Sequence, residues 1–87
     1  MRLDRDEVKA ALRAKVIALA RALDMDASGI SDADILPATG LLDSAAILEL
    51  VVWFETTYDF PIPQEDVNID NLGSIDAMAD FLLARKR

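Results

Sequence analysis

Cysteine and histidine are both absent from the 87 residues of the sequence. Without cysteine, the chain has no residue for a disulfide, a thiolate nucleophile or a cysteine-bound zinc ion. Without histidine it lacks the commonest general base, so carboxylates, amines, hydroxyls and one tyrosine remain for side-chain chemistry. We therefore expect that the protein is not an enzyme.

Long apolar runs are absent as well. The longest apolar stretches fall far short of the ~20 residues that a membrane-spanning helix needs. Residues 1–7 carry five charges in place of an apolar leader. The sequence therefore predicts a cytoplasmic protein that does not bind membranes.

Lysine and arginine are missing from residues 22–84, which hold thirteen carboxylates. All nine cations lie toward the two ends of the chain, and the net charge is −7. Such a surface repels nucleic acid and anionic membranes and attracts basic proteins. Solubility would also account for acidic residues, but it does not require that every cation be missing from 63 consecutive positions. We expect basic protein partners and no nucleic acid.

The remaining composition predicts one ordered domain. Hydrophobic residues make up 53% of the chain, with only three glycines and three prolines, which is typical of a globular protein rather than a disordered one. A chain of this length has room for one core. We expect a monomer with a single domain over residues 1–87.

Apolar residues recur at helical spacing in three segments. The first helix is expected at residues 4–23 and the second at residues 44–58, where Asp43 or Ser44 can cap it. The last helix begins after Ser74, which can act as its cap. The expected core positions of the three helices are Val8, Leu12, Val16, Ile17, Leu19, Leu23, Ile47, Leu50, Val51, Phe54, Tyr58, Ile75, Met78, Ala79 and Leu82.

The connections complete the expected fold. A long loop covers residues 24–43, residues 63–67 can form at most a short helical turn, and Arg85 to Arg87 lie at the negative end of the last helix. The residues expected to pin the long loop to the core are Ile30, Ile35, Leu36 and Leu41. No segment alternates as a β-strand does. We expect an all-α four-helix bundle with three main helices, one short helix and a long first loop.

The second helix is more apolar than a surface helix requires, because Glu49 is the only polar residue between positions 45 and 54. Beside its core-facing side, a second strip runs down the helix from Ser44. The strip consists of Ala45, Leu48 and Val52, with Glu49 and Glu55 at its rim. Either the neighbouring helices or the long loop cover this strip as ordinary core, or it is a surface on which partners dock.

Several motifs of the second half follow one another in a specific order. They are Gly40-Leu41-Leu42-Asp43-Ser44, Ile47-Leu48-Glu49-Leu50-Val51, Phe54-Glu55, Tyr58-Asp59-Phe60-Pro61-Ile62-Pro63 and the segment 69–82. This order resembles the attachment region and the closing segments of acyl and peptidyl carrier proteins. The resemblance extends over the chain from about Val8 onward.

The resemblance implies an acyl-carrier-like bundle and a carrier protein. It implies that Ser44 takes a 4'-phosphopantetheine arm from coenzyme A and that Asp43 assists the transferase through its magnesium ion. The thiol of the arm would hold an activated acyl or aminoacyl group as a thioester. The residue chemistry agrees, because a helix N-terminus favours a phosphodiester and a chain without a base must be modified by an enzyme in trans.

The resemblance also implies three kinds of partner. They are a phosphopantetheinyl transferase, an ATP-dependent aminoacyl or acyl ligase and a downstream acyl-transfer enzyme. We expect these enzymes to contact the apolar strip and its surroundings. The expected partner-binding residues are Leu42, Ala45, Leu48, Glu49, Val52 and Glu55.

Two departures from the carrier pattern bear on the cargo. Ala45 stands where leucine is usual after the modified serine, and Ala46 stands where fatty-acid carriers commonly have an acid. The run Gly-Leu-Leu-Asp-Ser resembles D-alanyl carrier proteins and stand-alone carriers that aminoacyl ligases charge. We therefore favour an aminoacyl cargo, with fatty-acyl or polyketide carriage as the alternative.

The long loop allows one different interpretation, an EF-hand. Asp24-x-Asp26-x-Ser28-Gly29 followed by Asp32 matches the first nine positions of a calcium-binding loop. Position twelve should be a bidentate glutamate but is Ile35, so we expect no calcium-binding role. A calcium-binding or protein-interaction helical module is the remaining alternative to a carrier.

Overall fold

The structure, a computed structural model, describes residues 3–86. Met1, Arg2 and Arg87 lie outside the described residues. The expectation that Arg87 lies at the negative end of the last helix therefore concerns a residue that is not described. The elements are α1 (Arg5–Ala22), α2 (Leu36–Thr39), α3 (Ser44–Thr57), the 3₁₀ turn η1 (Gln64–Asp66), α4 (Ile69–Leu72) and α5 (Ile75–Lys86). Residues 3–86 contain helices and no strand, so the expected all-α fold is confirmed.

The bounds of α1 follow from its caps. Oδ1 of Asp4 accepts hydrogen bonds from the backbone amides of Asp6 and Glu7, at 2.9 and 3.4 Å, and these two acids favour the positive end of the helix. Leu23 is the C-cap and is 40% exposed. Its expected place in the core is therefore wrong, because the helix ends before Leu23 completes another buried turn.

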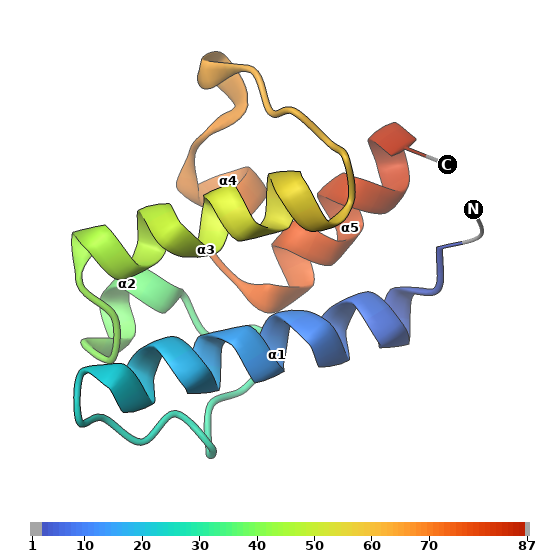
Figure 1. Cartoon of the computed structure of the whole chain (residues 1–87). Helices are drawn as coiled ribbons and strands as arrows, with labels where there is room; N and C mark the ends of the chain where they lie inside the picture. Colours follow the sequence, from blue (N-terminus) through green and yellow to red (C-terminus); the bar gives the residue numbers. More distant parts are fainter. Residues whose placement is uncertain (1–2, 87) are drawn as a thin grey trace.

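The three long helices form the core. α1 packs against both α3 and α5; α3 runs antiparallel to α1, and α5 runs in the same general direction as α3 but inclined to α1 (Figure 1). Ile47, Val51 and Tyr58 are only half-buried at the edge of the core. α3 therefore presents a narrower face to the core than its apolar content suggests. The largest fully buried side chains are Leu12, Val16, Leu50, Phe54, Ile75, Met78 and Leu82.

Two short helices, α2 and α4, are not predicted by the sequence pattern, because four residues are too few to show a helical period. α2 has Pro37 in its first turn and ends at Gly40, which adopts a left-handed conformation with φ of 74°. α4 follows Asn68, whose Oδ1 accepts a hydrogen bond from the amide of Asn71 at 2.9 Å. With η1, the described residues contain three short helical segments where one was expected.

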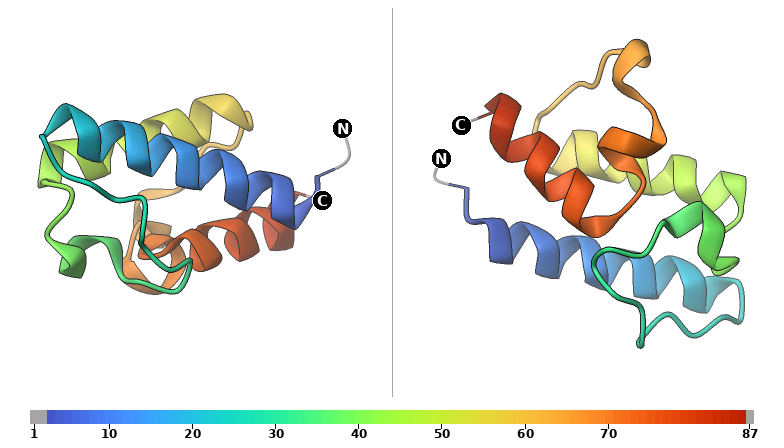
Figure 2. Two further views of the ribbon diagram at one scale, coloured as in Figure 1. Left: turned by 90° about the horizontal axis from the view of Figure 1, so that it is seen from below. Right: turned by 180° about the vertical axis from the view of Figure 1, so that it is seen from behind.

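The long connection between α1 and α3 runs back along α1 (Figure 2), and Asp32 ties it to two helices. Its carboxylate pairs with Nζ of Lys9 at 2.9 Å and with Nη2 of Arg13 at 2.6 Å. Its carbonyl accepts a hydrogen bond from the amide of Asp76, directly inside α5, at 3.0 Å. A single loop residue thus joins α1 to α5.

The apolar anchors of this connection differ in part from the expected set. Ile30 and Leu36 are buried and Leu41 is half-buried, but Ile35 is 40% exposed and Leu42 takes a place in the core. Ile35 is the N-cap of α2, and the helix that starts there turns Leu36 inward in its place. Within residues 3–86, no helix has both the length and the apolar character needed to cross a membrane.

Candidate functional site

Ser44 is the first residue of α3, and it is exposed. The preceding residue, Asp43, has an extended backbone, and its Oδ1 accepts a hydrogen bond from the amide of Ala46 at 2.8 Å. Asp43 is therefore the N-cap of α3. Because Asp43 supplies the cap, the Ser44 hydroxyl is not needed to hold the helix, and it lies beside the free amides at the positive helix end.

The segment before Asp43 is fixed by a turn and an apolar anchor. Oγ1 of Thr39 donates to the carbonyl of Leu36 at 2.7 Å and accepts from the amide of Leu41 at 3.2 Å. Leu42 is only 5% exposed. Its expected place in the partner-binding surface is therefore wrong, because the chain buries this side chain in the core as it enters α3.

The apolar strip on α3 is exposed. Leu48 is 63% exposed and Val52 is 59% exposed, and Ala45 is exposed in the turn before them. None of the described residues covers this strip as core, and Glu49 lies exposed at its rim. We call Ala45, Leu48 and Val52 the docking strip, after the role in partner binding that we propose for it below.

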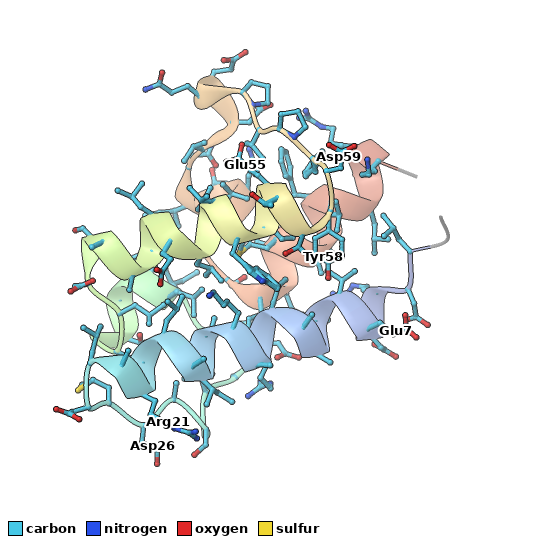
Figure 3. The ribbon with its side chains drawn as sticks, in the orientation of Figure 1. Glu7, Arg21, Asp26, Glu55, Tyr58 and Asp59 are labelled. Atoms are coloured by element: carbon cyan, nitrogen blue, oxygen red, sulfur yellow. The ribbon has the colours of Figure 1, made fainter. Side chains whose placement is uncertain are left out.

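Glu55, the other expected rim charge, has a structural partner. Its Oε2 accepts a hydrogen bond from the amide of Ile62 at 2.8 Å, and its side chain is half-buried. Figure 3 shows it on the side of α3 that faces the connection leaving that helix. Glu55 therefore fixes this connection and is not the free rim charge that the sequence pattern suggests.

An apolar groove of ≈ 150 Å³ lies on the α4 side of α3. Two of its residues, Val67 and Ile69, are 45% and 58% exposed. The sequence pattern does not identify them as part of the site, although two large apolar side chains in an otherwise polar segment are a usable signal. The residues that line the groove are Pro37, Ile47, Val51, Val67, Asn68, Ile69, Leu72 and Gly73.

A second hollow, of ≈ 210 Å³, lies on the α1 side of α3. The end of α1 and the start of α3 meet at one end of the molecule (Figure 1), and the small side chains of Ala45 and Ala46 leave space between them. The two hollows therefore lie on different sides of α3. The residues that line this second one are Leu19, Ala22, Leu23, Asp43, Ala45, Ala46 and Glu49.

Ion pairs between the described residues lie away from the docking strip. Hydrogen bonds from Lys9 and Arg13 lower the pKa of Asp32. No pair within residues 3–86 includes Asp43 or Glu49, so these two charges are not neutralised by an ion pair among the described residues. The pairs are Arg5–Asp76, Arg5–Asp80, Lys9–Asp32, Lys9–Asp76, Arg13–Asp32 and Arg85–Asp66.

Two acids of the calcium-like loop, Asp26 and Asp32, have hydrogen-bond or ion-pair partners of their own. Oδ1 of Asp26 accepts a hydrogen bond from the amide of Ser28 at 2.9 Å, and hydrogen bonding with Ser28 lowers the pKa of Asp26, with Arg21 close by (Figure 3). Asp32 is paired with two cations. In the part of the chain that the structure describes, no three acidic, histidine or cysteine side chains are arranged to hold a metal ion. The geometry gives the EF-hand interpretation no support.

A helical bundle with an exposed serine at the head of an apolar helix has the architecture of a carrier domain. Comparison with protein families agrees, because the phosphopantetheine attachment site family matches residues 16–82. No curated protein and no solved structure matches the chain. The chain belongs to the phosphopantetheine attachment site family.

Family membership establishes the general class of function. Proteins of this family are carriers rather than enzymes, and their covalent cofactor is 4'-phosphopantetheine. A phosphopantetheinyl transferase attaches the cofactor, and acyl-handling enzymes are the further partners.

Proposed function

We propose that Ser44 is the attachment residue and that the protein presents an activated aminoacyl group, held as a thioester, to partner enzymes. The observation that carries this proposal is the division of roles at the start of α3. Asp43 caps the helix, and the Ser44 hydroxyl is left exposed at its positive end. This position suits the negative charge of a phosphodiester.

The other serines lack this combination. Ser74 is 6% exposed, and its hydroxyl accepts a hydrogen bond from the amide of Ala77 at 3.0 Å. Ser31 uses its hydroxyl to accept from the amide of Ala33 at 3.2 Å. Ser28 follows an alanine in a loop. Only Ser44 follows an acid at the start of an apolar helix.

The transfer itself needs an enzyme, because the chain has no histidine and the carboxylate beside Ser44, that of Asp43, is engaged in the cap of α3. Oγ of Ser44 would form a bond to the β-phosphorus of coenzyme A, adenosine 3',5'-bisphosphate would leave, and the serine proton would pass to a base of the transferase. Oδ1 of Asp43 is engaged by the amide of Ala46. Its second oxygen is the one we assign to the magnesium ion of the transferase.

The arm supplies a terminal thiol that forms the thioester. We propose a small aminoacyl cargo that stays outside the bundle, because large apolar side chains occupy the core. Phe54, Leu50 and Leu12 are at most 1% exposed, and the ring centroids of Phe60 and Phe81 lie 5.6 Å apart. A long chain would have to displace packed side chains, and overpacking a core is costly.

One observation favours a second candidate, carriage of a fatty-acyl or polyketide group. The groove on the α4 side of α3 is lined by apolar side chains and could take a few methylene groups of a chain. Both candidates use the same serine and the same arm, so they differ only in the cargo and the enzyme that loads it.

We further propose that partners reach the arm across the docking strip, with Glu49 as rim charge. An acyl or aminoacyl ligase, driven by ATP, would load the thiol, and an acyl-transfer enzyme would unload it. A cytoplasmic location would supply both ATP and coenzyme A. The net charge of −7 supports a monomer, since like-charged copies repel each other.

The attachment is tested by incubating the purified chain with coenzyme A and a broad-specificity phosphopantetheinyl transferase. Intact-mass measurement should show one added phosphopantetheinyl group on the wild type and on Ser31→Ala, and none on Ser44→Ala. A mass gain on Ser44→Ala would show that another residue is modified. Failure of the wild type, while a known carrier is modified in the same tube, would overturn the proposal.

The cargo is tested with the same transferase and a series of acyl- and aminoacyl-coenzyme A donors, which attach the arm with its cargo in place. The melting temperature should not rise with chain length if the cargo stays outside the bundle. A rise that grows with chain length would show that the chain is bound, because a ligand held by the folded state stabilises it. That result would move the assignment to fatty-acyl carriage.

A further inference from the structure

The segment that leads from α2 to Ser44 is short and carries few hydrogen bonds. Residues 40–43 form it, and α2 itself packs against α3 beside the start of that helix (Figure 1). Of the amides of residues 41–43, that of Leu41 alone donates a hydrogen bond within residues 3–86. The acceptor is Oγ1 of Thr39, at 3.2 Å. The hydrogen bonding of this segment therefore depends on one side chain at the end of α2.

Thr39 ties the Leu41 amide to a fixed part of the bundle. Its Oγ1 also donates a hydrogen bond to the carbonyl of Leu36 at 2.7 Å. The Leu36 side chain is 2% exposed, and the Leu36 amide donates to the carbonyl of Gly73 at 2.7 Å. Gly73 lies between α4 and α5. The hydroxyl of Thr39 thus joins the entry to α3 to a residue that both the core and the junction of α4 and α5 hold in place.

Leu42 is the second hold on the segment, since its side chain is buried in the core. An apolar contact is not directional, so it fixes the depth of the chain but not the rotation of its peptide groups. A hydrogen bond has a preferred angle and fixes that rotation. Loss of the bond from Leu41 to Thr39 would therefore leave Leu42 buried and allow the peptide groups before Ser44 to turn.

We propose that Thr39 is a positioning residue for the modification of Ser44. Its hydroxyl fixes the entry to α3 so that Oγ of Ser44 meets the phosphate of coenzyme A in line. It acts through Leu41 and does not touch the reacting atoms. This inference rests on the proposed function of Ser44, and it adds α2 to the parts of the chain that serve the transfer.

A purely structural role of Thr39 is the main alternative. Its hydroxyl satisfies backbone groups at the end of a helix, which by itself stabilises a fold. A structural role predicts a lower free energy of unfolding and an unchanged rate of modification of the folded chain. A positioning role predicts that the folded chain is itself modified more slowly, because small misplacements of reacting groups slow a reaction strongly.

Single turnovers, with the transferase in excess over the full apo chain, separate these roles. The mass of the product, followed at several transferase concentrations, gives the maximal rate and the half-saturating concentration. Thr39→Val removes the hydroxyl with little change of shape, and it should lower the maximal rate by about tenfold at an unchanged half-saturating concentration. Leu48→Asp, a change in the docking strip, should raise the half-saturating concentration instead.

Two control variants isolate the hydroxyl of Thr39. Thr39→Ser keeps the hydroxyl and loses a methyl group, so it should retain the maximal rate of the wild type. Ser31→Ala removes a hydroxyl from an equivalent bond earlier in the long connection, where Oγ of Ser31 accepts from the amide of Ala33 at 3.2 Å. It should change neither the maximal rate nor the half-saturating concentration.

Hydrogen exchange gives a readout that does not involve the transferase. The Leu41 amide should be protected in the wild type and in Thr39→Ser, and it should lose its protection in Thr39→Val. The Ala46 amide, bonded to Asp43 at 2.8 Å, should be equally protected in all three, because Thr39 takes no part in the cap of α3. An unprotected Leu41 amide in the wild type would overturn the inference.

Circular dichroism must show that each variant is folded under the conditions of the assay. If Thr39→Val does not fold, Thr39→Ala, which removes the same hydroxyl with less bulk, takes its place. If both fail to fold while Thr39→Ser folds, the hydroxyl is required for the fold itself, and that result also overturns the inference.

Three kinetic results would contradict a positioning role. A wild-type maximal rate in folded Thr39→Val would leave Thr39 with a structural role alone. A change confined to the half-saturating concentration would make Thr39 part of the docking surface. A Thr39→Ser variant as slow as Thr39→Val would show that the hydroxyl is not the cause. Absence of any modification in the wild type would instead remove the proposed function of Ser44.

Discussion

At the scale of single residues, two neighbours at the start of α3 have separate tasks. Asp43 closes the helix end through the amide of Ala46, and Ser44 is exposed directly after it. Were Ser44 itself the cap, its hydroxyl would be committed to the helix. The acid therefore has a structural role in addition to the role that we propose for it in the transfer.

These two roles of Asp43 can be separated by substitution. Asp43→Ala should lower the free energy of unfolding by ~1 kcal/mol, whereas Asp43→Asn should cost little, because asparagine caps helices as well as aspartate does. Both variants should be modified more slowly, because both lack the carboxylate. Urea denaturation and a mass time course measure the two effects. A wild-type rate for Asp43→Asn would leave Asp43 with the capping role alone.

A second prediction concerns calcium. Asp32 is held by Lys9 and Arg13, and position twelve of the calcium-like loop is Ile35. Calorimetry should therefore detect no binding at the ~10⁻⁵ M or tighter dissociation constants of calcium sensors. Binding in that range, lost in Asp26→Asn, would restore the EF-hand interpretation.

The prediction of Ser44 and Asp43 as site residues rests on a local signal: an acid and a serine at the start of an apolar helix. Leu42 and Glu55 could not be judged in the same way. The core packing of Leu42 and the hydrogen bond between Glu55 and the Ile62 amide depend on how the chain folds back on α3. Neither contact produces a periodic pattern in the sequence.

At the scale of the elements, α3 has two apolar sides, one buried and one exposed to solvent. One side carries Leu50 and Phe54 into the core, and the other leaves Leu48 and Val52 in solvent. The periodicity predicts both sides and identifies the core side, but it does not predict whether the second side is covered as well. Coverage is a tertiary property, and it depends here on α1, α5 and the short helices.

The docking strip predicts a contrast between two substitutions of exposed apolar residues. Leu48→Asp should weaken the complex with the transferase by ~2 kcal/mol or more, the size of an interface hot spot. Ile35→Asp should have little effect, because Ile35 is also exposed but lies outside the strip. The rate of modification by the transferase is measured on both folded variants. Equal rates for Leu48→Asp and Ile35→Asp would show that the strip is not the docking surface.

The rim charge should act differently from the strip. Glu49→Lys should slow association and flatten its dependence on salt, because exposed charges steer the encounter more than they hold the complex. Stopped-flow measurements over a range of ionic strengths would show this. A change confined to the dissociation rate would argue for a buried contact at Glu49 instead.

The end of α4 depends on a glycine. A Cβ at Gly73 would collide with the carbonyl oxygen of Ile69 and lie 2.8 Å from its Cγ2, whereas a Cβ at Gly29 would meet nothing within 4 Å. Gly73→Ala should therefore lower the free energy of unfolding by about 1–3 kcal/mol, and Gly29→Ala should change it by about 0.5 kcal/mol or less. Urea denaturation of the pair gives the comparison.

At the scale of the whole molecule, the acidic residues fall into two groups, those that pair with cations of the chain and those that do not. Cations of α1 pair with acids of the long connection and of α5, and the acids beside Ser44 have no such partner among the described residues. The sequence predicts this division in outline, since its cations lie only toward the ends of the chain. It does not predict which acids are used internally, because those pairs join residues far apart in the chain.

Asp32 makes the free energy of unfolding depend on pH in the acidic range. Its pKa is lowered by Lys9 and Arg13, so its ion pairs contribute fully above the unfolded-state pKa of ~3.9 and are lost as the pH falls through the folded-state value. Asp32→Asn should reduce the free energy of unfolding by about 1 kcal/mol near neutral pH, since these charges are partly screened by solvent. The gap to the wild type should narrow below pH ~4.

Urea denaturation across this pH range measures the gap. Glu65→Gln, an exposed acid of η1, serves as the control and should change the unfolding midpoint little at neutral pH. A gap for Asp32→Asn that stays constant down to the lowest pH would show that the lost stability comes from the geometry of the connection rather than from the charge of Asp32.

The start of α1 and the end of α5 lie together at the end of the molecule opposite the start of α3 (Figures 1 and 2). The molecule is 35 Å along its longest axis. A bead, a surface anchor or a neighbouring module joined by a linker to either end would therefore sit at the opposite pole from Ser44. Such a tether would leave the arm free to reach the active sites of partner enzymes. The protein can therefore be immobilised or fused without masking the residue that we propose to carry the cofactor.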